Sequence, residues 1–210
     1  MIINLMVMLL TEKQKIKHVT WITAIGFLGS AFTFVLTIFI APLPDFSSEV
    51  PKISQLMLTM GQIGTALLII GCVAYGIKMA EEKKTIHAIG FTSMSVAQGI
   101  LFVLYLISYN GHEKFEEAYR MFSASLYLLI PSMLLIAIYS EFPKWLRILG
   151  AVACIPYAVE NILFSFTGKF DETIMMIDGI GNILFNFVYI CWGIYVLRNL
   201  KQELKEINSM

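Results

Sequence analysis

Apolar residues dominate six long runs of the chain, and polar residues gather between them. Each run reaches the roughly 20 residues that a helix needs to cross the hydrocarbon core of a bilayer. The runs cover residues 19–41, 53–77, 85–108, 118–140, 145–167 and 173–197. The short segments between them hold charged residues, proline or glycine, which are typical of turns. The pattern predicts an all-α integral membrane protein, a six-transmembrane-helix bundle that forms a single transmembrane domain over residues 1–210.

The first ten residues are apolar, and the charged residues Glu12, Lys13, Lys15 and Lys17 follow them. A secretory signal peptide has the reverse order, with basic residues before the apolar ones. We therefore interpret residues 1–10 as an interfacial segment or a frayed helix start.

The distribution of lysine and arginine predicts the orientation of the bundle. With the N-terminus inside, eleven of these residues fall on the inner side: Lys13, Lys15, Lys17, Lys78, Lys83, Lys84, Lys144, Arg147, Arg198, Lys201 and Lys205. Only Lys52, Lys114, Arg120 and Lys169 fall on the outer side. Positive charge in short loops favours the cytoplasmic face. We expect a multi-pass protein of the plasma (inner) membrane with both termini in the cytoplasm.

Short sequence matches suggest an internal repeat. Residues 24–27 (Ala-Ile-Gly-Phe) recur at 88–91, and a related Ile-Leu-Gly-Ala stands at 148–151. The Ile63-Gly64 pair of the second run likewise recurs as Ile180-Gly181 in the sixth. These matches fit three tandem helical hairpins in parallel orientation. Glycine also recurs in membrane helices through close packing alone, so both explanations stay open.

Composition excludes a soluble globular protein. Apolar residues make up 58% of the chain and charged residues 14%, against about 45–50% and 25% in soluble domains. Fifteen basic residues balance fifteen acidic ones, which gives no reason to expect a nucleic-acid partner. The expected partners are membrane lipids and a small-molecule ligand, and a homo-oligomer stays open. The cysteines, Cys72, Cys154 and Cys191, form no CxxC pair and are expected to pack as apolar residues.

Charged residues within the apolar runs are the strongest candidates for function, because each costs several kcal/mol in a membrane unless it is paired or hydrated. Glu160 lies in the fifth run and Asp178 in the sixth, and Arg120 lies one turn into the fourth. All three fall in the expected outer half of the membrane. From their depths, we expect Arg120 to form an ion pair with Asp178 and to leave Glu160 as the free acid.

Helical spacing places further polar residues on the same faces as these charges. Asp178, Asn182 and Asn186 recur every four residues, and Asn161 adjoins Glu160. The other candidate ligand-binding residues are Gln62, Gln98 and Tyr127, together with Arg120. The inner halves of the runs are nearly apolar. The pattern predicts a polar pocket that opens to the outside above an apolar floor, although amides and hydroxyls also join helices as plain packing contacts.

Several kinds of chemistry are excluded. The three histidines, His18, His87 and His112, are too dispersed for a histidine zinc site, and no lysine lies in mid-membrane to form a retinal Schiff base. We expect no metal and no cofactor. Acid–base catalysis by Glu160 and Asp178 survives, because it needs only two carboxyl groups in different environments.

The leading hypothesis is a membrane protein that binds and transports a small solute, cationic or amphipathic, through Glu160 and Asp178. The main alternative is a membrane-embedded enzyme that acts on a lipid or isoprenoid, with the same carboxyl groups as acid and base. A noncatalytic partner or sensor is the third. The sequence does not decide whether the protein is an enzyme.

Overall fold

The computed structural model of the protein describes residues 2–41, 54–109, 115–167 and 172–209. These residues form six helices and no strand: α1 (Ile2–Ile40), α2 (Gln55–Glu81), α3 (Thr85–Tyr109), α4 (Phe115–Tyr139), α5 (Lys144–Thr167) and α6 (Glu172–Ser209). Each helix contains a stretch that is long and apolar enough to span a membrane. The expected all-helical architecture of six membrane-length helices is therefore confirmed.

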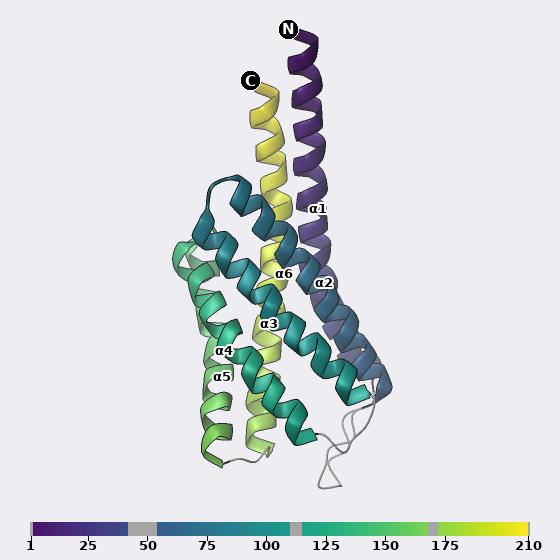
Figure 1. The fold of residues 1–210 in the computed structure, drawn as a ribbon, viewed down its shortest axis with the longest axis vertical. Helices are drawn as coiled ribbons and strands as arrows, with labels where there is room; N and C mark the ends of the chain where they lie inside the picture. The colour runs from purple at the N-terminus through teal and green to yellow at the C-terminus, as the bar shows by residue number, and fades with distance from the viewer. Residues whose placement is uncertain (1, 42–53, 110–114, 168–171, 210) are drawn as a thin grey trace.

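The first and last helices extend beyond their expected spans. The α1 helix begins at Ile2 and runs through the charged residues around Lys15, and α6 continues past Arg198 to Ser209. Lysine, glutamate and glutamine are good helix formers, so a helix continues where the apolar run ends. The beginning of α1 and the end of α6 project from the same end of the bundle, which we call the terminal end (Figure 1).

The helices form a closed ring. Each helix packs against its neighbours in the sequence, and α1 packs against α6 to close the circle. No other pair of helices brings its backbones together within the described ranges. Helices on opposite sides of the ring, such as α3 and α6, therefore meet only through side chains, as Phe91 and Trp192 do.

Glycine lets the first two helices approach closely. Gly26 of α1 faces Gly71 of α2, and a Cβ added to Gly71 would lie 3.1 Å from the Gly26 Cα. Small residues at such crossings let two helix backbones touch, which is how membrane helices gain packing contacts. The α1–α2 interface therefore depends on these two residues having no side chain.

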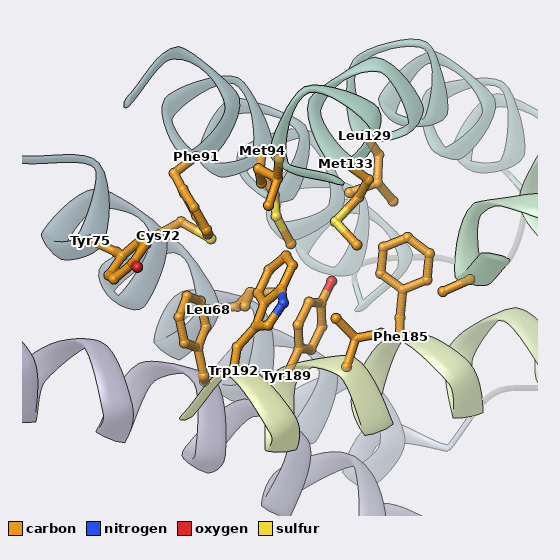
Figure 2. Close-up of a cluster of buried hydrophobic side chains, with 14 of the residues drawn as sticks. Leu68, Cys72, Tyr75, Phe91, Met94, Leu129, Met133, Phe185, Tyr189 and Trp192 are labelled. Atoms are coloured by element: carbon orange, nitrogen blue, oxygen red, sulfur yellow. The ribbon is translucent and has the colours of Figure 1, made fainter. Parts of the chain in front are cut away.

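The centre of the ring is filled by large apolar side chains. Trp192 and Tyr189 come from α6, Phe91 from α3, Met133 from α4 and Tyr75 from α2, and all five are buried. Figure 2 shows them converging on the axis from different helices. The outer surface instead exposes many isoleucines, phenylalanines and leucines, which suits contact with lipid rather than water.

Ion pairs of the described residues gather at the terminal end. Lys84, in the turn between α2 and α3, lies 2.5 Å from a Glu82 oxygen and 2.6 Å from a Glu141 oxygen. Lys78 of α2 lies 2.5 Å from Glu203 of α6. These contacts join α2, α6 and the segment between α4 and α5.

Candidate functional site

The polar residues of α6 form a hydrogen-bonded row in the half of the bundle opposite the terminal end. The Asn182 Nδ2 donates to Oδ2 of Asp178 over 3.0 Å and to the Asp178 carbonyl over 3.1 Å. The Asn186 Nδ2 donates to the Asn182 carbonyl over 2.8 Å. The spacing of four residues thus places Asp178, Asn182 and Asn186 on one helix face, as the sequence indicates.

Tyr157 joins this row to α5. Its hydroxyl donates to Oδ1 of Asn182 over 2.9 Å, so hydrogen bonds run from Tyr157 through Asn182 to Asp178. Its ring lies against Gly181, where an added Cβ would come within 3.0 Å of a ring carbon. Gly181 therefore makes room for the tyrosine that orients the Asn182 amide.

Glu160 lies one turn after Tyr157 on α5 and is completely buried, at 0% exposure. Tyr157 thus adjoins Glu160 on its own helix and reaches Asp178 through the Asn182 amide. Asn161, next to Glu160, is buried as well, and its Oδ1 accepts a hydrogen bond from the Ser123 hydroxyl of α4. The site thus draws residues from α4, α5 and α6.

The expected site residues Gln62 and Gln98 lie on α2 and α3, on the other side of the ring. Gln62 of α2 donates through Nε2 to the Tyr105 carbonyl of α3 over 3.4 Å. The Tyr105 ring packs over Gly61, where an added Cβ would lie 2.8 Å from it. Gln98, two turns earlier on α3, is 5% exposed.

Two expected site residues lie elsewhere. Tyr127 is 65% exposed on the outer face of α4, and Arg120 is exposed as well. No ion pair joins Arg120 to Asp178 among the residues that the structure describes, so the expected pair is wrong. The physical reason is the rotation of α4, which leaves Arg120 exposed, so a matching depth does not bring its guanidinium to Asp178 of α6.

Neither Tyr157 nor Tyr105 is among the site residues expected from the sequence, where Tyr127 is the tyrosine proposed. A signal for Tyr105 exists, because it follows Gln98 by seven residues and so lies on the same helix face. Tyrosine in an apolar run is common in cores, which is why neither residue stood out.

Within the described ranges, no group of three or more histidine, cysteine, aspartate or glutamate side chains could hold a metal ion. The six apolar helices are consistent with a multi-pass membrane protein. Comparison with known protein families, curated proteins and solved structures finds no match to this chain. The site therefore has to be interpreted from its own residues.

Proposed function

We propose that this protein binds a small cationic solute at Glu160 and Asp178 and carries it across the membrane. The observation that carries the proposal is that Tyr157 lies one turn from the buried Glu160 and is linked through Asn182 to Asp178, inside a bundle whose outer surface is apolar. Amides from α2, α3, α5 and α6 (Gln62, Gln98, Asn161, Asn182) supply directional contacts. With both termini in the cytoplasm of a plasma membrane, the half of the bundle opposite the terminal end, which we call the polar half, faces the outside.

We further propose that the chain consists of three related hairpins, α1–α2, α3–α4 and α5–α6. Equivalent glycines make equivalent contacts. An added Cβ on Gly26 would meet the Leu67 carbonyl of α2, and one on Gly90 would meet the Ser132 carbonyl of α4. Three further contacts have an equivalent in another hairpin. The contact of Gly71 with Gly26 corresponds to that of Ile136 with Gly90. The contact of Gly64 with Thr33 corresponds to that of Gly181 with Tyr157, and the contact of Gly76 with Thr92 corresponds to that of Gly193 with Leu28.

This correspondence supports a functional role for the carboxyl groups. Asp178 takes the place that Gly61 holds in α2, and Glu160 takes the place of Leu36 in α1 and Ile100 in α3. Two hairpins therefore pack in the same ring with glycine or an apolar residue at these positions. Because packing does not require an acid there, the cost of burying one points to a ligand.

The arrangement of the bundle supports entry from the polar half. Trp192, Tyr189 and Phe91 close the axis above the site, and the ion pairs of Lys84 and Lys78 join helices at the terminal end. A solute that enters from the polar half would reach the carboxyl groups before these barriers. Release on the other side would require the aromatic side chains and ion pairs to move apart, as in alternating access.

Electrical recording from proteoliposomes tests the proposal. Sudden addition of ethylammonium or benzyltrimethylammonium to the wild-type protein should produce a transient current. Asp178→Asn and Glu160→Gln should reduce it at least tenfold while they leave expression and thermal stability nearly unchanged. An amide can replace a carboxyl group in a packing contact but cannot compensate a positive charge.

Glu81→Gln is the control, since Glu81 is an exposed acid that pairs with Lys15 at the terminal end. It should give wild-type currents. Wild-type currents in both site variants would reject the proposal. It would also be rejected if neither cation produced a current with the wild-type protein.

A further inference from the structure

Tyr157, which lies one turn from Glu160 and hydrogen-bonds to Asn182, is packed among aromatic rings. The Tyr157 ring meets the Phe122 ring of α4 with centroids 6.0 Å apart and the Phe185 ring of α6 at 5.0 Å, both edge to face. Three helices, α4, α5 and α6, thus bring rings together one turn from Glu160.

The rings continue from this level along the axis of the bundle. The ring centroids of Phe185 and Tyr189 lie 5.9 Å apart, those of Tyr189 and Trp192 also 5.9 Å, and those of Trp192 and Phe142 5.3 Å. We call Tyr157, Phe185, Tyr189, Trp192 and Phe142 the aromatic column. Its three members on α6 are spaced by four and three residues, so they share the face that points to the axis (Figure 2).

One buried polar atom of the column has no hydrogen-bond partner among the described residues. The indole Nε1 of Trp192 is buried, in a residue 1% exposed, and makes no hydrogen bond with the described residues. Buried donors normally have an acceptor, and each exception calls for an explanation. A core built only for packing gains nothing from this N–H, whereas a ligand or its hydration water that passes along the column can accept from it.

These observations point to one class of ligand. We propose, on the basis of the proposed function, that the solute is an organic ammonium ion with apolar or aromatic substituents. The faces of aromatic rings attract cations, and they recognise alkylated ammonium groups best, because such groups are weakly hydrated. A small, strongly hydrated cation would lose its water among these rings with little in return.

Binding measurements on the purified wild-type protein test this proposal by calorimetry in a neutral detergent. Methylammonium and benzyltrimethylammonium carry the same charge and differ in apolar surface, and benzyl alcohol carries the ring without the charge. We expect benzyltrimethylammonium to bind at least tenfold more tightly than either of the other two. Asp178→Asn should weaken the binding of both cations at least tenfold.

Phe185→Leu separates the contribution of the rings from that of the acids. It should remove most of the preference for benzyltrimethylammonium over methylammonium. Phe187→Leu on the same helix is the matched control, because Phe187 is half-exposed on the outer face. Thermal unfolding of each variant verifies that it is folded, and the comparison of ligands on the wild-type protein stands without any variant.

The outcomes separate this inference from the proposed function. Equal affinity of the wild-type protein for the two cations, with loss of both in Asp178→Asn, would overturn the aromatic inference and leave the cation site intact. Benzyl alcohol binding as tightly as benzyltrimethylammonium would also overturn it, since the rings would then act only as an apolar surface. Failure of both cations to bind would reject the proposed function as well.

Discussion

Gly26 shows how much a single residue controls in this bundle. A Cβ on this residue would fall on the backbone of Gly71, and the backbone cannot move aside as a flexible side chain would. Gly99 of α3 is also a glycine within a helix, but a Cβ added to it would meet no atom within 4 Å. The two glycines therefore differ in their surroundings alone.

Alanine substitutions should separate these two glycines. We expect Gly26→Ala to lower the free energy of unfolding by about 1–3 kcal/mol, because it overpacks the α1–α2 crossing. Gly99→Ala should be neutral or raise it by up to about 1 kcal/mol, because alanine is the better helix former. Thermal unfolding of the purified variants measures both, and equal effects would contradict the close approach of α1 and α2.

Lys84 should make stability depend on alkaline pH. Partial burial lowers the pKa of its ammonium group, but hydrogen bonds to Glu141 and Glu82 raise that pKa by more, so it lies above its ordinary value. A raised pKa means that the folded state holds the proton more tightly. The stabilisation is therefore complete below the ordinary lysine pKa of about 10.4 and is lost as the pH rises through the folded-state value.

We expect Lys84→Met to lower the free energy of unfolding at pH 7 by about 1 kcal/mol or less, as is usual for partly exposed ion pairs. The difference from the wild-type protein should shrink above the ordinary lysine pKa. Lys144→Met, at an exposed lysine that begins α5, controls for the loss of one charge. A difference that persists unchanged at high pH would show that Lys84 acts through packing.

At the scale of the element, α5 carries both site residues and a proline within the helix. Pro156 lies inside the helix, directly before Tyr157. Proline lacks the N–H that would bond to the carbonyl four residues earlier, here that of Val152, and such positions often bend or act as hinges. The residue that orients Asn182 therefore stands where α5 is least constrained by its own hydrogen bonds.

Pro156→Ala should raise the thermal midpoint, because it restores up to one backbone hydrogen bond and removes a cost of at most about 3 kcal/mol. If α5 bends during transport, the same change should slow the benzyltrimethylammonium current and leave the affinity unchanged. Pro131→Ala in α4 is the comparison, since Pro131 is also within a helix but exposed on the outer face. A current unchanged by Pro156→Ala would exclude Pro156 as a hinge.

At the scale of the whole molecule, both termini emerge at one end of the ring, and the charge distribution predicts that this end is cytoplasmic. In a variant with the three native cysteines replaced by alanine, a cysteine at Ser48 or Gly168 should react with a membrane-impermeant thiol reagent in intact cells. Ser48 and Gly168 lie outside the described residues, in the segments between helices. A cysteine at Glu82, in the turn next to Lys84, should not react, and the reverse pattern would place the site on the cytoplasmic side.

The sequence by itself determined the six helices and which polar residues share a helix face. Helix length follows from the apolar length needed to cross a bilayer, and a shared face follows from the 3.6-residue period, so both are local properties. The row from Asp178 to Asn186 and the adjacency of Glu160 and Asn161 were predictable for this reason. The part of α6 beyond residue 197 was not predictable. A fall in hydropathy marks the end of a membrane span, but a helix can continue beyond it.

Only the tertiary structure decided which faces meet. The Arg120 side chain is exposed on α4 and does not pair with Asp178, whereas the Tyr157 hydroxyl of α5 donates to Asn182 of α6. These relations depend on how each helix is rotated and which helices adjoin, and those choices are set by contacts between residues far apart in sequence, such as Gly26 with Gly71. A single sequence records the periodicity of each helix but not the angle at which it packs against the next, so the contact between Tyr157 and Asn182 emerged only from the folded bundle.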